Sequence, residues 1–197
     1  MPKLLINIPT HFETERLFLR AYQAGDGSWY NAMCQRNKTH LTPFEAGNPI
    51  HDVHSETDAE VLVRQFTADW AARSRFFLAV FEKSTDDFAG QIYIGTVNRD
   101  LPEFEVGYFA ERDHQGRGYI TEGVQGSLGF IFKYLQAQRV CLECDDSNQR
   151  SFHVAERCGF VKEGHIRRNK RHEGGLLTGT LFYGMLKKEY EAKNAPL

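Results

Sequence analysis

The chain has 197 residues, of which 41% are hydrophobic and 13% aromatic, so it can bury the core of one ordinary domain. We therefore expect a single domain over residues 1–197. The formal net charge of -2 at pH 7 excludes a general nucleic-acid binder, which carries a strong basic excess. No apolar run approaches the roughly 20 residues that span a bilayer. Residues 1–10 also lack the apolar centre of a signal peptide, which predicts a cytoplasmic protein and no membrane partner.

The first part of the chain predicts a strand and two helical regions. Residues 12–22 alternate apolar and polar side chains, which is typical of a strand with one buried face, and Gly-Asp-Gly-Ser then opens a helix. Residues 37–54 contain Pro, Gly, Asn and His without a clear period, so we expect a long loop or irregular helical turns near a functional edge. Ser55 and Asp58 resemble a capping box, which predicts an amphipathic helix extending to about Arg73.

The remainder of the chain predicts a meander of strands followed by alternating helices and strands. The expected elements are strands at 76–81, 91–98 and 104–110, a helix at 124–135, a strand at 140–144, a short helix at 148–157, and closing strands at 160–168 and 179–187. The fold class is therefore α+β, or mixed α/β. We expect a central, mixed, mostly antiparallel sheet flanked by helices.

The four cysteines, Cys34, Cys141, Cys144 and Cys158, have no secretory context, so we expect free thiols. Cys141 and Cys144 form a C-x-x-C, for which zinc or redox chemistry is the alternative. Period-two alternation, however, sends these two side chains to opposite faces of a strand. We expect no metal site.

A glycine-rich turn at residues 115–119 lies between a predicted strand and a predicted helix. Its glycines allow a tight turn that leaves backbone N–H groups unpaired, and the helix dipole adds roughly 0.3–1 kcal/mol for an anion there. Such a turn is suited to bind an anion. By itself, however, the same pattern is also typical of the start of a helix that binds no ligand. The turn is not a Walker loop, because no Gly-Lys-Ser/Thr follows it. It is not a Rossmann fingerprint either, because the strands before it are expected to form a meander and not the start of a βαβ unit.

Residues 115–120 resemble the signature Gln/Arg-x-x-Gly-x-Gly/Ala of the GNAT superfamily of N-acetyltransferases. This signature is preceded by a strand carrying 105–108 and followed by 121–122. The stretches that resemble the ribosomal-protein acetyltransferase branch are 14–17 with 19–20, 41–45, and 148–151 running into 158–160 and 163–164. The resemblance runs in order over nearly the whole chain. It implies an acetyl-CoA-dependent enzyme in which this turn binds the pyrophosphate of coenzyme A.

The resemblance implies that the acceptor of the acetyl group is the N-terminal α-amino group of a ribosomal protein. The first acceptor residues would lie in a groove between residues 37–54 and the last hairpin, and a narrow groove would admit only small residues such as Ala or Ser. The alternatives are a small amine such as an aminoglycoside, polyamine or amino acid, and a coenzyme A-binding module without turnover. Ribosomal association and a monomeric or homodimeric state are left open.

The resemblance also implies which residues bind the coenzyme. These are Phe109, Ala110, Gln115, Gly116, Arg117, Gly118, Tyr119, Ile120, Thr121, Asn148 and Ser151. A backbone N–H of Phe109 or Ala110 would face the developing oxyanion if the strand splays or bulges there. Asn148 would bind the pantetheine amides, with helix capping as its alternative role.

Acetyl transfer needs a base for the ammonium and a proton for the leaving thiolate. The resemblance implies that Glu105 is the base, acting through water, while an exposed strand glutamate is the alternative. It also implies that Ser151 lies near the coenzyme sulfur and donates the proton, with helix capping as the alternative. Two positions depart from the family: Ile120 replaces a small residue, and Ala155 replaces a tyrosine that serves many members as the general acid.

Three histidines, His114, His153 and His165, have no carboxylate at recognisable spacing, so we expect them to be surface or packing residues. The basic run at 167–171 lies between the closing strands. It suits an acidic peptide, the ribose phosphate of the coenzyme or ribosomal RNA, with a solvated hairpin tip as the alternative.

Overall fold

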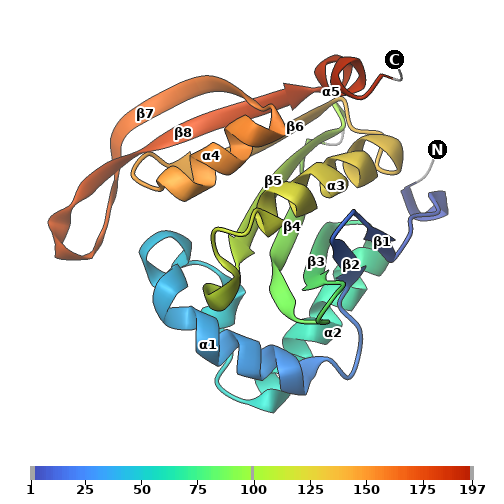
Figure 1. Ribbon diagram of the computed structural model, residues 1–197, viewed down its shortest axis with the longest axis vertical. Helices are drawn as coiled ribbons and strands as arrows, with labels where there is room; N and C mark the ends of the chain where they lie inside the picture. Colours follow the sequence, from blue (N-terminus) through green and yellow to red (C-terminus); the bar gives the residue numbers. More distant parts are fainter. Residues whose placement is uncertain (1–2, 99, 196–197) are drawn as a thin grey trace.

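The computed structural model describes residues 3–98 and 100–195. Within these residues the first five strands form an antiparallel meander, each pairing with the next along the chain (Figure 1). They are β1 (His11–Glu13), β2 (Leu17–Ala21), β3 (Arg75–Glu82), β4 (Phe88–Asn98) and β5 (Glu103–Ala110). The predicted meander is therefore confirmed and extended by β1 and β2.

Three further strands complete one sheet of order β1-β2-β3-β4-β5-β6-β8-β7. They are β6 (Arg139–Asp145), β7 (Val161–Arg171) and β8 (Leu177–Leu186). β6 runs parallel to β5, and the other neighbours are antiparallel. The predicted mixed, mostly antiparallel sheet is confirmed, and the β7–β8 hairpin extends away from the rest of the molecule (Figure 1).

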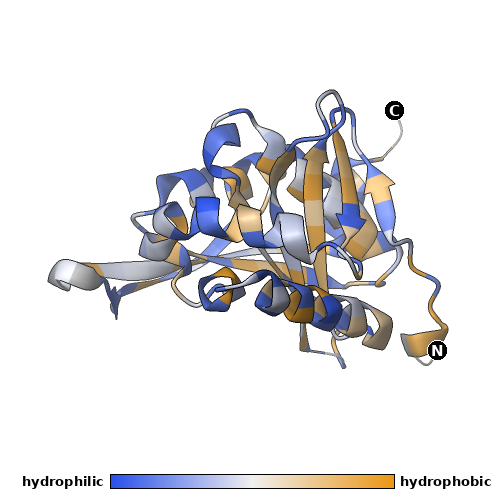
Figure 2. Cartoon of the chain, turned by 90° about the horizontal axis from the view of Figure 1, so that it is seen from below, coloured by the Kyte–Doolittle hydropathy of each residue, from blue (hydrophilic) through white to orange (hydrophobic). Residues whose placement is uncertain are grey.

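Helices lie on both sides of the strands, in which the hydrophobic residues are concentrated (Figure 2). They are α1 (Gly27–Glu45), α2 (Glu56–Ala72), α3 (Tyr119–Lys133), α4 (Gln149–Cys158) and α5 (Lys187–Lys193), with 3-10 turns at Lys3–Leu5, Pro49–Asp52, Arg112–His114 and Glu173–Gly175. Two cores result. One packs α3 and α4 against the sheet, and the other packs α1 and α2 against its opposite face.

The expectation of a long loop or irregular helical turns over residues 37–54 is wrong for its first half, where the regular helix α1 continues to Glu45, while a 3-10 turn at Pro49–Asp52 lies in the second half. The period is hidden because Asn37 is a polar residue on the buried face: its amide donates to Met33 O at 2.8 Å and accepts from Arg112 N–H at 3.0 Å. Pro43 lies in the last turn of the helix, where it removes one backbone hydrogen-bond donor close to the point at which the helix ends. The cap of α2 is confirmed, since Ser55 Oγ accepts from Asp58 N–H at 3.1 Å.

Strands β5 and β6 separate soon after they meet. Their pairing covers three residue pairs, from Glu103↔Arg139 to Glu105↔Cys141, and both strands continue beyond it without pairing to each other. β5 leads to the glycine-rich turn and α3, and β6 leads to α4. The sheet is therefore open between the beginnings of these two helices.

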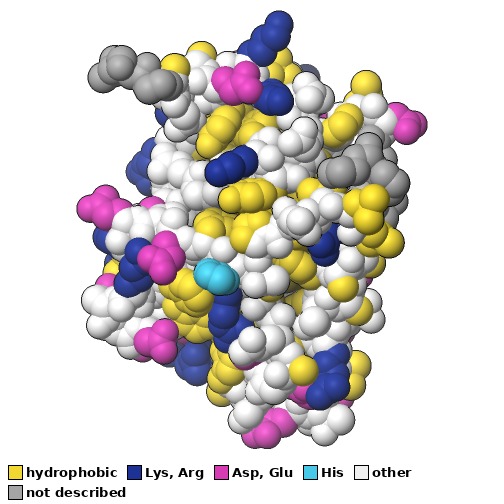
Figure 3. Space-filling view, turned by 90° about the vertical axis from the view of Figure 1, so that its right-hand side faces the viewer, with side chains coloured by type: hydrophobic (Ala, Val, Ile, Leu, Met, Phe, Trp, Pro, Cys, Tyr) yellow, Lys and Arg dark blue, Asp and Glu magenta, His cyan; other side chains and the backbone are white. Residues whose placement is uncertain are grey.

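Cys141 and Cys144 lie on opposite faces of β6, as predicted, since Cys144 packs in the core beside Leu142 while Cys141 is half-buried outside it. No described cysteine forms a disulfide. In the described ranges, no helix has the length and apolarity needed to cross a membrane. On the face shown in Figure 3, Lys and Arg side chains alternate with Asp and Glu instead of forming a continuous basic surface.

Candidate active site

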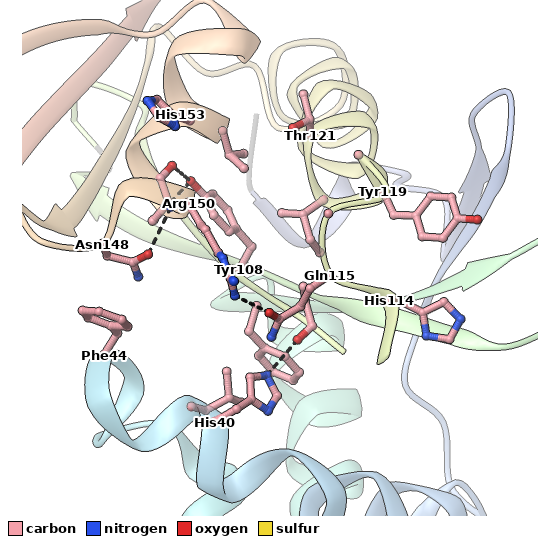
Figure 4. Close-up of a pocket in the computed structure, with 18 of the residues that line it drawn as sticks. His40, Phe44, Tyr108, His114, Gln115, Tyr119, Thr121, Asn148, Arg150 and His153 are labelled. Carbon is pink, nitrogen blue, oxygen red and sulfur yellow. Dashed lines mark hydrogen bonds between the residues drawn. The ribbon is translucent and has the colours of Figure 1, made fainter. Parts of the chain in front are cut away.

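A cavity of about 470 Å³ lies where β5 and β6 separate (Figure 4). Its walls come from the end of α1, the last residues of β5, the glycine-rich turn with the start of α3, and α4. Ten of the predicted site residues line it: Phe109, Ala110, Gln115, Gly116, Gly118, Tyr119, Ile120, Thr121, Asn148 and Ser151. Segments distant in sequence thus meet at one site.

The glycine-rich turn has the backbone conformation that the sequence predicts. Gly116 and Gly118 have φ of 79° and 80°, a left-handed region that favours glycine. Gly118 is the N-cap of α3, and the first intrahelical bond runs from Glu122 N–H to Gly118 O at 3.1 Å. The N–H groups ahead of Glu122 therefore have no intrahelical acceptor, which suits them to an anion.

The first turn of α3 is tied to the N-terminal strand region. The Glu122 carboxylate accepts hydrogen bonds from Thr14 Oγ1 at 2.6 Å and from the Arg16 backbone N–H at 2.8 Å, and it forms an ion pair with the Arg16 guanidinium at 2.7 Å. Burial raises the pKa of Glu122, but these bonds outweigh burial and the pKa is lowered. Arg16 also donates to Arg117 O at 3.1 Å.

Arginine side chains surround the turn in two different ways. Arg150, from the first turn of α4, donates to Gln115 Oε1 and lines the cavity (Figure 4). Arg117 is exposed and is not among the lining residues, so its predicted contact with the coenzyme remains a prediction. The cationic end of the cavity is therefore formed by backbone N–H groups and Arg150, and a second arginine, Arg157 at the other end of α4, also lines the cavity.

At the start of α4, Asn148 and Ser151 lie beside a tyrosine. Asn148 Oδ1 accepts from Ser151 N–H at 3.2 Å, so the capping role exists, and the amide NH₂ of Asn148 is available to a ligand. Tyr108 donates its hydroxyl proton to Ser151 O at 2.8 Å, and Ser151 Oγ lies 3.4 Å from the Tyr108 hydroxyl (Figure 4). Burial raises the pKa of Tyr108 well above its ordinary value.

The residue that replaces the family tyrosine, Ala155, is 0% exposed and belongs to the core beneath α4. The Ala155 side chain is not among those that line the cavity. Tyr108 provides a phenol from β5 instead, beside Ser151. Tyr108 lies within a stretch that resembles the family, but no role was predictable for it, because its approach to Ser151 depends on the packing of α4 against the open sheet.

Glu105 lies on the other face of β5 from Tyr108, and it is not among the lining residues. Its Oε1 accepts from the Tyr93 hydroxyl at 3.0 Å, and burial, with the Glu105 charge, raises the pKa of Tyr93 to about 12. Gly95 makes room for this pair, since a Cβ there would lie 2.3 Å from the Tyr93 hydroxyl. The role of Glu105 as a base remains a prediction.

The opening of the sheet decides which backbone N–H faces the cavity. Glu111 N–H donates to Ala89 O on β4, and N–H groups alternate in direction along a strand. The Phe109 N–H therefore points toward β4, and the Ala110 N–H points toward the opening. The strand splays here as expected, while the irregularity of the β4–β5 ladder lies at Thr96 and Asn98.

The far end of the cavity is formed by the end of α1, which also contacts the hairpin. His40 Nε2 lies 3.1 Å from Ala110 O, and Phe44 and Glu45 also line the wall. The Phe44 ring packs edge-on against His172 at a centroid distance of 6.0 Å. His172 is held by Asp145, with Nε2 2.8 Å from its Oδ2, so β6 fixes this contact.

The expectation that the histidines lack carboxylate partners is corrected for two of them. His165 Nε2 lies 2.8 Å from Asp146 Oδ2 of a distant segment, and His114 Nδ1 lies 3.4 Å from Glu111 Oε2, three residues earlier in the chain. His114 and His153 also line the cavity. The basic run at 167–171 is exposed on the edge strand β7, where the ladder shifts between Ile166 and Lys170, and it does not line the cavity.

Comparison with known proteins gives one family for most of this chain. Residues 16–161 match the model of the acetyltransferase (GNAT) domain. An uncharacterized N-acetyltransferase, p20, of Bacillus licheniformis is 28% identical over 178 residues, which are 90% of this chain and 96% of the relative. The match therefore includes the cavity and its surrounding elements.

Two further relatives have named acceptors. The ribosomal-protein-serine acetyltransferase of Escherichia coli K12 is 27% identical, covering 70% of this chain and 74% of its own. The spermidine N(1)-acetyltransferase of Vibrio cholerae is 26% identical, covering 77% and 82%. A solved ribosomal L7/L12 α-N-protein acetyltransferase in complex with coenzyme A shares the fold, with a TM-score of 0.79 at 19% identity over 92% of this chain and 98% of that chain.

Proposed function

Because this chain belongs to the GNAT acetyltransferase family and is an acetyl-CoA-dependent N-acetyltransferase, we propose that its acceptor is the N-terminal α-amino group of a ribosomal protein. The observation that carries the proposal is the exposed basic hairpin beside the cavity. Its His172 packs against Phe44 of the cavity wall, so a polypeptide entering there meets the basic strand β7. Ribosomal association and a cytoplasmic location belong to the same proposal.

The residues at the opening fit coenzyme A. The glycines with positive φ and the free N–H groups at the start of α3 suit its pyrophosphate, and the Asn148 amide suits the pantetheine. The chemistry that acetyl-CoA supplies when bound is an acetyl group activated as a thioester. The Ala110 N–H, which points into the opening, is positioned to stabilise the negative charge that develops on the acetyl oxygen.

Two proton transfers accompany attack by the amine. Glu105 removes the proton from the acceptor ammonium through water, since its carboxylate lies on β5 outside the cavity lining. The Tyr108 hydroxyl gives its proton to the leaving thiolate, and Ser151 Oγ, 3.4 Å away, returns a proton to Tyr108 while taking one from solvent. The raised pKa of Tyr108 keeps this hydroxyl protonated at neutral pH.

The test is release of coenzyme A from acetyl-CoA in the presence of amino-terminal peptides, with aminoglycosides and polyamines in parallel. Selective turnover of peptides that begin with Ala or Ser, as in ribosomal proteins, is the expected result. Turnover of small amines only would show that the acceptor is a small amine and not a protein. Binding of coenzyme A without any turnover would identify a sensing module.

The small-amine alternative has an observation of its own. The relative from Vibrio cholerae is a spermidine N(1)-acetyltransferase, and a carboxylate, Glu45, lines the cavity of this chain. A polyamine carries several positive charges, so it would need more than one such carboxylate. Glu45 is the one acidic side chain among the described residues that line the cavity, which favours an acceptor with a single ammonium.

A further inference from the structure

The cavity has two ends of opposite charge. Its coenzyme end contains the start of α3 and Arg150, which donates to Gln115 of the glycine-rich turn. Its α1 end contains Glu45, the last residue of that helix. An anion is therefore favoured at the first end and a cation at the second.

The Glu45 carboxylate lacks a full partner among the described side chains. It accepts one long hydrogen bond, from Asn48 Nδ2 to Oε2 at 3.4 Å, and it forms no ion pair there within 4.0 Å. Lys170 of β7 contributes a favourable charge from a greater distance. A half-buried carboxylate with one weak bond is a costly arrangement, and an arriving ammonium compensates for it.

Glu45 lines the same cavity as Tyr108, whose hydroxyl pairs with Ser151. Phe44 and Tyr108 present aromatic rings to this cavity, which suit a cation. A cation held by Glu45 therefore shares the cavity with the Tyr108 hydroxyl and the N-terminal end of α4.

We propose that Glu45 forms the subsite for the acceptor, binding its protonated primary amine before the proton is removed. This inference rests on the proposed function. It adds the chemical class of acceptor that the site selects, which is a molecule with a single ammonium group. Glu45 is a positioning residue, and the proton still leaves toward Glu105. Because an ion pair stabilises the ammonium form, removing Glu45 weakens binding and does not slow proton removal.

The test compares Glu45→Gln with Glu105→Gln and Glu56→Gln. Glu56 is an exposed carboxylate in the first turn of α2, so its variant matches the charge change away from the cavity. In Glu45→Gln we expect the KM for the acceptor to rise by about tenfold to a hundredfold. The kcat and the KM for acetyl-CoA should stay within about twofold, and Glu45→Asp should restore part of the affinity. Glu105→Gln should lower kcat instead.

A binding measurement separates this inference from the activity. The protein saturated with coenzyme A is titrated with an Ala-initiated tetrapeptide, with the same peptide acetylated at its amino terminus, and with spermidine. Wild type should prefer the free amine to the acetylated peptide by about tenfold or more, and Glu45→Gln should lose that preference. Equal affinities in wild type would overturn the subsite. A preference that persists without turnover would overturn the proposed activity and retain the subsite.

Discussion

The Glu122 carboxylate, in the first turn of α3, accepts a hydrogen bond from the backbone of Arg16 and forms an ion pair with its side chain, across 106 residues of sequence. The contact connects the segment before β2 to the helix whose N-terminus faces the cavity. Because Arg16 also donates to Arg117 O, it holds the glycine-rich turn from outside. Coenzyme affinity should therefore depend on a residue that does not line the cavity.

We expect Glu122→Gln to weaken coenzyme A binding by about threefold to tenfold and to lower the free energy of unfolding by about 1 kcal/mol. The side-chain oxygen of the glutamine can still accept a hydrogen bond from Thr14, but the ion pair with Arg16 is lost. Isothermal titration with coenzyme A and urea unfolding measure the two effects. Glu15→Gln, which removes an exposed carboxylate next to Arg16, is the control. Equal affinities of the two variants would contradict the role of the contact.

Gly118→Ala should destabilise the protein by about 1 kcal/mol, because an alanine at φ of 80° is strained. A turn that relaxes this strain also moves the N–H groups of α3, so the Kd for coenzyme A should rise. Gly47→Ala is the matched control, since a Cβ there meets no atom within 4 Å and its φ is ordinary. A Gly118→Ala protein with unchanged stability and affinity would show that the turn tolerates a side chain.

The glycine-rich turn was predictable because it depends on local chemistry: glycine favours positive φ, and a helix start leaves N–H groups unpaired. The amphipathic helix after Ser55 was predictable for the same reason. The extension of α1 to Glu45 was not, because Asn37 is buried by contacts with Arg112, far away in sequence. The Tyr108–Ser151 pair and the position of Glu45 likewise depend on where β5 and β6 separate, which no local pattern encodes.

Tyr108→Phe should lower kcat by roughly 10²-fold, the usual contribution of a general acid. If Tyr108 and Ser151 act as one unit, Ser151→Ala combined with Tyr108→Phe should be little slower than Tyr108→Phe alone. Because the pKa of Tyr108 lies well above its ordinary value, its hydroxyl stays protonated in mild alkali. Wild-type kcat should therefore show no loss attributable to a phenol up to about pH 10. A fully additive double variant would argue against the shared proton path.

Asp145→Asn tests the anchor of the hairpin. Burial raises the pKa of Asp145, but hydrogen bonds from Ser147, Thr178 and His172 outweigh it and lower the pKa from its ordinary 3.8 to about 2. A lowered pKa stabilises the folded state above about pH 4, and this contribution is lost as the pH falls toward 2. We expect the substitution to cost about 2 kcal/mol at pH 7, measured by urea unfolding.

The difference between Asp145→Asn and wild type should shrink as the pH approaches 2, since the wild-type carboxylate is then about half protonated in the folded protein. Asp113→Asn is the control, because that carboxylate is exposed and pairs with Arg112 at the surface. If the loss of unfolding free energy in Asp145→Asn does not depend on pH, the charge of Asp145 is not what holds His172. Loss of His172 from this position should also free Phe44 and widen the acceptor end of the cavity.

Because β5 separates from β6, the sheet of this protein stays incomplete between these two strands until a ligand binds there. Beyond Glu105 and Cys141 the facing edges have backbone groups that no neighbouring strand satisfies. The two amides of pantetheine have the same donors and acceptors as a peptide, so a coenzyme arm bound between these edges would serve as a short guest strand. Each catalytic cycle would then insert and withdraw a structural element. At a hundredfold excess over Kd this guest would add about 2.7 kcal/mol of stability, so the abundance of acetyl-CoA would help to set how long the enzyme survives.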